Sequence, residues 1–380
     1  MTVELVLASI AGAWILAYIL LKYVFKRSVT GLTIYPLFLI LRSRGVAGPL
    51  DRLAGMAPRF WDAVSRAAIV VGAGLAAFAI YILSSNLSTY LFRPEAVGPQ
   101  NIVIPLIIGV TIRIEQIPYL LLAFGIVLIT HEGLHGIIAR REGLPVKSAG
   151  IFLVFILPGG FVEPDEEAFK KSSPGARLRV AAVGSFANLA VGVLVVLAMM
   201  GLFSPYEGGL MVVQTESSSR IPVNEVLVKI DGVPVNSQTV RSINITLGER
   251  LEVSGILDSY TFNIRPEAVG MSIPLGTLIR SLGVTQVDSY IPLRWVNGDP
   301  ATVYTLYKSL FWLQLVSLGV AVFNMLPMHM LDGSIMLRAI LERLGVKRVG
   351  EASTLATAAC LTLLASNIFM TYRFFGFFQL

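Results

Sequence analysis

The residues best suited to chemistry in this chain are His131, Glu132 and His135, which form the pattern H-E-x-x-H. They lie toward the end of an apolar stretch that we expect to be helical, at 117–140. The i, i+4 spacing puts both imidazoles on one helix face, close enough to bind one Zn²⁺ ion. The glutamate between them is suited to act as general base on a zinc-activated water. The motif therefore predicts a zinc site with hydrolytic chemistry.

A catalytic zinc needs a third protein ligand and an open fourth position. The chain has only three histidines, and its one cysteine, Cys360, excludes a disulfide and a cysteine-based zinc cluster. Candidates for the third ligand, Asp332 and His329, both follow another apolar stretch. Pro327 is expected to end the helix there, so that the next residues turn toward the two histidines. From the residues alone, either side chain is able to complete the site.

An ionisable side chain inside an apolar span is costly and usually functional. Glu132 is such a side chain, since it lies in the same apolar stretch as its two histidine neighbours. The alternative is a polar cluster satisfied by other helices, or a helix end at the lipid headgroups. Leaving a buried glutamate unpaired costs several kcal/mol, which favours the metal site.

The composition predicts a polytopic membrane protein. The 380 residues are 55% hydrophobic and only 14% charged, with a mean hydropathy of +0.73, whereas soluble domains carry about 25% charged residues. The formal net charge is +6. Its basic residues lie in short loops between apolar runs, which indicates a lipid bilayer rather than a nucleic acid as the partner.

Six apolar segments are long enough to span a bilayer as helices. They are residues 3–25, 66–91, 117–140, 178–203, 304–327 and 352–376. The first is expected to be a retained anchor, because its positive charges follow the apolar run instead of preceding it. Two further apolar stretches, 31–41 and 101–114, are too short or too interrupted to span and are expected to be re-entrant or interfacial.

Basic residues in the short loops predict the orientation. The loops at 26–66, 140–179 and 338–348 are rich in lysine and arginine, whereas the loop at 92–116 holds only two basic residues. Six spans with both termini outside fit this bias. The site would then lie toward the cytoplasmic side, and the long segment 204–303 would be extracytoplasmic.

Segment 204–303 differs in character from the rest of the chain. It alternates apolar and polar residues and has turn signals at Asp231-Gly232 and Gly248. Such alternation is typical of half-buried strands. We expect a small β-rich domain at about 205–267, with 268–303 as an extension that leads back to the membrane.

These motifs resemble the site-2 protease family of intramembrane metalloproteases. The family pairs H-E-x-x-H with a distant N-x-x-P-x-x-x-L-D-G motif, which is read here from Asn324 through Pro327 and Leu331 to Asp332 and Gly333. The resemblance implies that Asp332, rather than His329, is the third zinc ligand. It also implies that Asn324 lies beside the metal and binds the substrate carbonyl or its oxyanion.

Three other stretches are similar to modules of this family. Residues 158–164 follow the first motif and would form hairpin strands at membrane level. Gly184-x-x-x-Asn188 resembles a family helix in which Asn188 would bind the substrate backbone, and helix packing is the alternative role. Segment 204–303 resembles a PDZ domain, in which Gly208 and Gly209 begin the loop that binds a carboxylate. Such a domain captures an extended protein tail by adding a strand.

The resulting hypothesis has four parts along the chain. They are N-terminal transmembrane helices with a cytoplasmic loop (1–100), the first half of the metalloprotease membrane core (101–203), the extracytoplasmic PDZ-like domain with its extension (204–303), and the second half of the core with the last helix (304–380). The fold class is an α-helical polytopic membrane protein with an inserted small β-rich domain. Its function would be zinc-dependent cleavage of membrane proteins within a single transmembrane helix.

Three rival functions remain. The main alternative is a non-catalytic membrane receptor or scaffold that captures protein tails through the PDZ-like domain; a glutamate between the two histidines argues against it, because a structural zinc needs no base. Another kind of membrane metalloprotease would need further histidine or glutamate ligands on separate helices. A transporter would have paired hydrophobic repeats, and the sequence has none.

Overall fold

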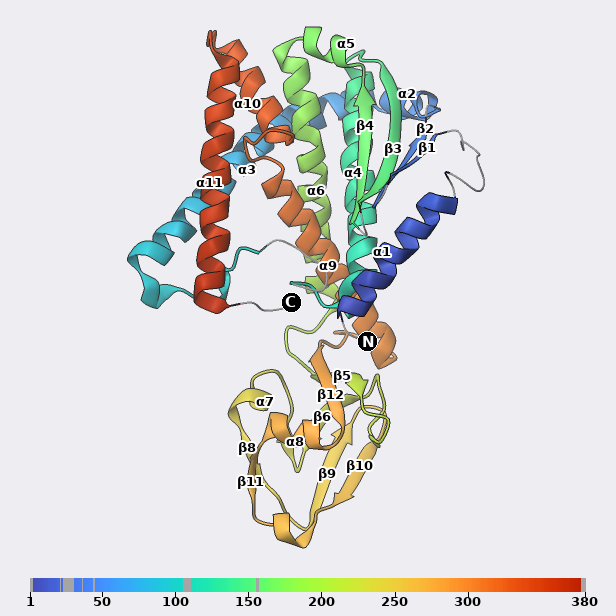
Figure 1. Cartoon of the computed structure of the whole chain (residues 1–380), viewed down its shortest axis with the longest axis vertical. Coiled ribbons are helices and arrows are strands. Elements are labelled where there is room, and N and C mark those ends of the chain that lie inside the picture. Colours follow the sequence, from blue (N-terminus) through green and yellow to red (C-terminus); the bar gives the residue numbers. More distant parts are fainter. Residues whose placement is uncertain are drawn as a thin grey trace. The chain divides into compact units, whose positions relative to one another are not determined.

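The computed structural model describes residues 3–20, 22, 31–35, 37–43, 45–104, 111–154 and 157–376. The chain divides into two compact units. The membrane unit comprises Met1–Val193 and Trp312–Leu380, and the inserted unit is Leu194–Phe311. Each unit is described by itself below, with the helices and strands labelled as in Figure 1.

Five described helices are long and apolar enough to cross a membrane. They are α3 (Pro58–Phe92), α4 (Ile117–Arg141), α6 (Pro174–Leu202), α9 (Pro300–Phe323) and α11 (Val349–Phe375). They correspond to five of the six predicted spans, so a predominantly helical membrane chain is confirmed and the count of six is not. The sixth prediction, 3–25, coincides with α1 (Val3–Ile19), whose 17 residues fall short of about 20 for a span; most of its remainder lies outside the described residues.

Most of these helices begin before the apolar run that predicted them. α3 starts at Pro58 rather than at residue 66, and α9 starts at Pro300 rather than at residue 304. The backbone hydrogen bonds of a helix continue into polar residues, whereas hydropathy detects only the apolar part. Proline at the first helical position explains both starts, since its missing N–H has no partner within the helix there.

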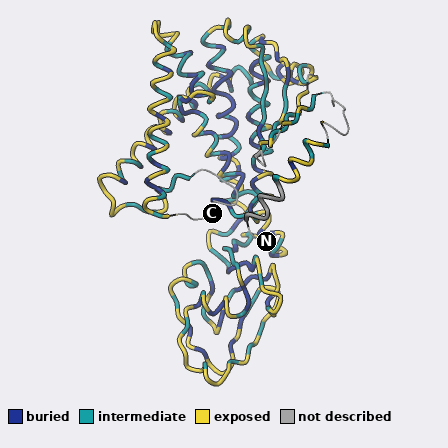
Figure 2. Tube along the Cα trace, in the orientation of Figure 1, coloured by how far each residue is buried: buried dark blue, intermediate teal, exposed yellow. Residues whose placement is uncertain are grey.

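Helix α6 is the most enclosed of the five. In its most apolar window 56% of the residues are buried, against 22–28% for the other four helices. Figure 2 shows buried residues along the inner helices of the membrane unit and exposed residues on the outer ones. A helix surrounded by protein is a rigid base for a site, because its side chains are fixed by packing.

A four-stranded antiparallel sheet accompanies these helices in the membrane unit. Its order is β1 (Leu32–Tyr35), β2 (Phe38–Ser43), β3 (Val146–Val154) and β4 (Leu157–Pro164). The first hairpin lies in the segment 31–41, which was expected to be re-entrant or interfacial; the structure adds that its described residues form paired strands, and its position relative to the membrane stays a prediction. The apolar run is rich in β-branched and aromatic residues, and periodicity alone does not separate a short buried strand from other apolar segments.

Strand β4 is one edge of this sheet and packs against α4, the helix that carries H-E-x-x-H (Figure 1). The pairing of β3 with β4 agrees with the expectation of hairpin strands at 158–164, and residues 155–156, between the two strands in sequence, lie outside the described residues. One strand with a free edge therefore runs beside the two histidines.

Shorter elements connect the spans. They are the helices α2 (Ala47–Met56), α5 (Glu166–Lys171) and α10 (Asp332–Arg343), and the 3₁₀ turns Pro94–Ala96, Pro99–Asn101 and Ile114–Gln116. The predicted re-entrant piece at 101–114 has its centre, 105–110, outside the described residues. Helix α10 begins at Asp332, so a helix start fixes the position of that carboxylate.

The inserted unit contains a sheet of order β10-β9-β6-β5-β12, with β7 paired to β6. Its strands are β5 (Gly209–Thr215), β6 (Val226–Ile230), β7 (Val233–Pro234), β9 (Arg250–Gly255), β10 (Ser259–Asn263) and β12 (Val284–Tyr290). Outside that sheet, β8 (Asn244–Thr246) pairs with β11 (Ser272–Pro274), and the short helices are α7 (Thr239–Ser242) and α8 (Leu275–Ser281).

The expected limit of the β-rich domain at residue 267 is wrong. β12 pairs along β5, and α8 contributes Leu275, Leu278 and Ile279 to the same core. The sequence of β12, VTQVDSY, is too polar to be recognised as a strand. Tertiary pairing with β5 overrides this weak local signal.

The glycine pair of the expected carboxylate-binding loop lies at the start of a strand. Gly209 begins β5, which is paired with β6 on one side and β12 on the other. The N–H of Gly208 donates to the carbonyl of Tyr290 at 2.9 Å. The N–H of Gly208 thus has a partner within the unit, and carboxylate binding by this glycine pair stays a prediction.

A buried carboxylate ties the inserted unit together. Glu225 is 0% exposed and accepts hydrogen bonds from the N–H groups of Val226, Leu257 and Asp258 and from the hydroxyl of Tyr260. Burial, with the bond to Glu225, raises the pKa of Tyr260 to about 12. One side chain therefore joins the start of β6 to the β9–β10 turn.

Replacing this carboxylate should loosen that turn. Glu225→Gln puts an amide NH₂ against backbone N–H donors, and an unsatisfied buried donor costs about 1–3 kcal/mol. We expect faster hydrogen exchange at 255–260 in the full-length protein, measured by mass spectrometry. Glu252→Gln, at an exposed position on β9, is the matched control and should change nothing. Unchanged exchange in Glu225→Gln would contradict the proposed anchoring.

Candidate metal centre

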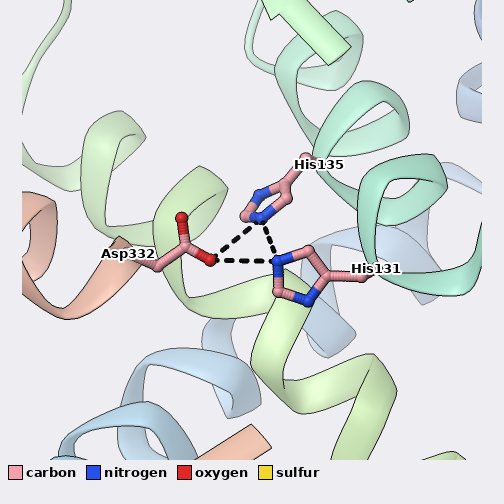
Figure 3. Close-up of side chains that lie close together, drawn as sticks. All are labelled: His131, His135 and Asp332. Atoms are coloured by element: carbon pink, nitrogen blue, oxygen red, sulfur yellow. Dashed lines mark hydrogen bonds and ion pairs between the residues drawn. The ribbon is translucent and has the colours of Figure 1, made fainter. Parts of the chain in front are cut away.

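Three potential metal ligands from two distant segments meet in the membrane unit (Figure 3). The side chains of His131 and His135 project from α4, and Asp332 is the first residue of α10. The two Nε2 atoms lie 3.1 Å apart. Oδ2 of Asp332 lies 3.0 Å from Nε2 of His135 and 3.3 Å from Nε2 of His131. The donor atoms therefore form a small triangle.

The size of this triangle fits zinc. Tetrahedral zinc with bonds of about 2.0–2.1 Å to nitrogen and oxygen holds its ligand atoms about 3.3 Å apart. The separations of 3.0–3.3 Å in the triangle are close to that value. Two imidazoles and one carboxylate also match the ligand types of catalytic zinc sites. Among the described residues, Asp332 belongs to the group that could hold a metal ion, whereas His329 is exposed and lies outside that group.

The orientation of His135 is fixed from the neighbouring helix α6. Its Nδ1 lies 2.6 Å from the carbonyl oxygen of Val180. A carbonyl oxygen only accepts hydrogen bonds, so Nδ1 must carry the hydrogen and donate it. The neutral ring then has its lone pair on Nε2, the atom that faces Asp332.

Helix α6 also contacts His131. Nδ2 of Asn188 lies 2.9 Å from Nδ1 of His131. Asn188 is 0% exposed, so its amide is enclosed against the imidazole. In this structure the amide therefore contacts a residue of the site, and a role of Asn188 in binding the substrate backbone stays a prediction.

Between these two contacts, α6 approaches the histidines at a glycine. A Cβ added to Gly184 would collide with Nε2 of His135 and would lie 2.6 Å from Cε1 and Nε2 of His131. The space beside both rings therefore exists only because residue 184 has no side chain. The sequence singles out Gly184, but this contact with the imidazoles is visible only in the fold.

Asn324 and Asp332 are joined across the turn between α9 and α10. Nδ2 of Asn324 donates to Oδ2 of Asp332 at 2.7 Å and lies 3.2 Å from Nε2 of His131. The N–H of Gly333 donates to the carbonyl of Asn324, which closes the turn. The structure thus brings Asn324 to the triangle, on the side of its aspartate.

The same turn is too tight for a side chain at residue 333. A Cβ on Gly333 would collide with the backbone carbonyls of Met325 and Leu326. We expect Gly333→Ala to displace Asp332 and weaken zinc binding about 10-fold to 100-fold, as changes behind metal ligands commonly do. Chelator competition on the purified protein measures this effect. Gly319→Ala on α9, where a Cβ meets nothing within 4 Å, is the control, and equal affinities would refute the prediction.

The side chain of Glu132 extends from α4 to strand β4 of the sheet. The N–H of Val162 on β4 donates to its Oε2 at 2.9 Å. Two cavities share Glu132, Phe161 and Val162 in their walls. The carboxylate is therefore fixed by the edge strand and accessible from two directions.

The two cavities differ in character. The first, about 800 Å³, is apolar and lies among α2, α4 and strands β2–β4. The second, about 550 Å³, contains the histidine–aspartate triangle and has a charged rim. That rim consists of Lys147, Glu163 and Glu166. Glu132 thus separates an apolar space from a polar one.

Sequence reasoning misses two contacts of the site. The carbonyl of Val180 and the N–H of Val162 are backbone groups; every residue carries the first kind and every residue except proline the second. No residue type signals them. The remaining predicted residues, Gly208 and Gly209, belong to the inserted unit, whereas the triangle belongs to the membrane unit.

Comparison with known proteins identifies relatives of this chain. A family model described as peptidase family M50 matches residues 119–365, well over half of the chain. An uncharacterized protein of Methanocaldococcus jannaschii is 33% identical over 131 residues, 32% of this chain and 34% of that protein. A membrane-bound transcription factor site-2 protease homolog of Arabidopsis thaliana is 27% identical over 157 residues, 39% of this chain and 29% of that protein.

These alignments span about a third of the length of each relative. The family match is broader, and it includes both the H-E-x-x-H segment and the turn that holds Asn324 and Asp332. The apolar helices add that the protein is a multi-pass integral membrane protein. The chain belongs to peptidase family M50, the site-2 protease family.

Proposed function

We propose that this protein is an intramembrane zinc protease that cleaves membrane proteins within a transmembrane helix. The observation that carries the proposal is the triangle of Nε2, Nε2 and Oδ2 atoms, 3.0–3.3 Å apart, contributed by α4 and α10. Membership of a metalloprotease family supports the activity. The five apolar helices support a substrate within the bilayer.

In the proposed site, His131, His135 and Asp332 hold Zn²⁺ through the three atoms of the triangle. When bound, the ion lowers the pKa of a water and polarises the substrate carbonyl. Asn324 keeps Oδ2 of Asp332 in position through its 2.7 Å hydrogen bond. Its amide also lies beside the triangle, in reach of an oxygen that gains negative charge during attack.

Glu132 is the proposed general base. Its carboxylate accepts a proton from the attacking water and returns it to the departing amine, which conserves the proton over the cycle. The amide of Val162 holds the carboxylate at the junction of the two cavities. Water would enter through the polar cavity, and the apolar cavity suits the side chains of a membrane segment.

A helical substrate must unwind before its backbone can be cut, because its amide groups are bonded within the helix. The free edge of β4 offers replacement partners. The N–H of Val162 points away from β3, toward Glu132, and alternation along an antiparallel strand gives Gly160 the same direction. An extended substrate would therefore pair at Gly160, next to the base.

The sidedness of the site is part of the proposal. Basic residues of the short loops support a site toward the cytoplasm and an extracytoplasmic inserted unit. Cysteine scanning of the native chain, which has a single buried cysteine, tests this assignment. The variant Glu167→Cys should react with a membrane-impermeant thiol reagent only after the membrane is permeabilised, which gives the reagent access to the cytoplasmic side. Labelling of Glu167→Cys in intact cells would contradict the assignment.

Reconstitution tests the activity itself. The full-length protein in lipid vesicles, with a single-span test substrate, should cleave that substrate within its apolar segment. A chelator should stop cleavage, and zinc should restore it, whereas magnesium should not. Binding of substrate tails without cleavage, in the presence of zinc, would instead favour the scaffold function of the PDZ-like unit.

A further inference from the structure

The buried amide of Asn188 has one atom that the fold leaves unexplained. Its Nδ2 faces Nδ1 of His131 at 2.9 Å. Its Oδ1 is buried without a hydrogen-bond partner among the residues that the structure describes. Buried polar atoms are nearly always hydrogen-bonded, so this oxygen requires a reason.

The chemistry of a ligating histidine supplies that reason. When Nε2 gives its lone pair to a metal ion, the neutral ring carries its hydrogen on Nδ1. The Nδ1–H group then needs an acceptor, and an amide NH₂ is not one. A half-turn of the amide exchanges its oxygen and nitrogen without moving other atoms, and their assignment follows from the hydrogen-bond network. The unpaired oxygen is the acceptor that this ring requires.

We infer that Asn188 is a positioning residue that fixes the tautomer of His131, with its Oδ1 accepting a hydrogen bond from Nδ1–H. This inference rests on the proposed metal site. It assigns Asn188 a place behind the ligand, where its amide oxygen keeps the lone pair of Nε2 directed at the triangle. The substrate plays no part in this contact.

The neighbouring contact on α6 supports the assignment independently. Val180, Gly184 and Asn188 are spaced i, i+4 and i+8, so they lie on one face of α6. His131 and His135 have the same spacing on α4. The carbonyl of Val180 is an acceptor by necessity and faces Nδ1 of His135.

The two helices therefore match in register. One acceptor stands behind each imidazole, and the glycine between them leaves room for both rings. With the oxygen of Asn188 turned toward His131, both histidines have the same tautomer and both direct Nε2 toward Asp332.

Two variants at Asn188 test whether Oδ1 or the NH₂ group of its amide interacts with His131. Asn188→Leu removes both polar atoms, keeps the branch point at Cγ and should weaken zinc binding about 10-fold to 100-fold; the control Asn367→Leu brings the same increase in side-chain volume. Asn188→Asp keeps only acceptors, and a carboxylate behind a ligating histidine is a common arrangement, so its zinc affinity should stay close to that of the parent. Affinity is measured on the full-length protein in detergent by competition with a chromogenic chelator.

A matched control separates this role from general packing. Asn367 on α11 is also 0% exposed and hydrogen-bonds to Asn86 and to Leu83. Asn367→Leu should lower the melting temperature and leave zinc affinity unchanged. Cobalt adds a spectroscopic readout, because Asn188→Asp should keep the visible absorption of the parent's cobalt complex.

Each outcome decides the inference. Parent-like affinity in Asn188→Leu overturns it, and so does an Asn188→Asp variant that loses as much affinity as Asn188→Leu, because the NH₂ group would then be the working end. If Asn188→Leu does not fold, the result for Asn188→Asp decides alone. A parent protein that binds no zinc refutes the metal site itself, which is a distinct result.

Discussion

Glu132→Gln is expected to abolish peptide-bond cleavage and to leave zinc binding intact. The amide of glutamine has nearly the same shape and can still accept the hydrogen bond from Val162, but it cannot take a proton from water. General base catalysis contributes about 10²-fold to 10⁴-fold to such reactions. Cleavage of a single-span substrate in vesicles and the zinc content of the purified variant measure the two properties.

Glu167→Gln is the control for this change. Glu167 is exposed on α5 and pairs only with Lys171 among the described residues, so both activity and zinc content should match the parent. Cleavage by Glu132→Gln at a rate close to that of the parent would remove Glu132 from the role of base. Loss of zinc together with activity would instead assign this residue to the metal site.

Gly184→Ala is expected to remove zinc binding almost entirely. The added methyl group would overlap Nε2 of His135 and crowd His131, and both rings are held from behind by α6. The methyl group would therefore displace both rings from the positions that face Asp332. We expect an affinity loss of about 100-fold or more, at or beyond the upper end of effects seen for changes behind ligands.

Gly201→Ala on the same helix is the matched control. A Cβ at Gly201 meets nothing within 4 Å, so alanine there raises helix propensity and touches no ligand. Chelator competition compares the two variants, and circular dichroism checks that both remain folded. Equal zinc affinity in Gly184→Ala and the parent would show that α6 does not pack against the imidazoles as described.

The part of the site that lies on one helix can be predicted from the sequence. His131, Glu132 and His135 follow from one motif, because the periodicity of a helix is local and decides which side chains share a face. The third ligand is different: spacing leaves Asp332 and His329 open, and only the family resemblance favours Asp332. The choice depends on how the turn after α9 folds back, which is a tertiary property.

The fold depends on tertiary pairing in the same way. The β1–β2 hairpin at 31–41 is an apolar run that pairs with β3, and β12, which the expected domain limit left out, is a polar run that pairs with β5. Neither partner is near in sequence. The family resemblance left Asn188 open between substrate binding and helix packing, and its contact with His131 depends on how α6 packs beside α4.

The separation of the ligands along the chain has a consequence for biosynthesis. His135 and Asp332 are 197 positions apart, and the whole inserted unit is translated between them. In the proposed zinc site, a nascent chain that has formed α4 would still lack its third ligand and would not hydrolyse peptide bonds. Activity would begin only after the turn that carries Asp332 has packed against α4, so the incomplete chain would be protected against premature proteolysis.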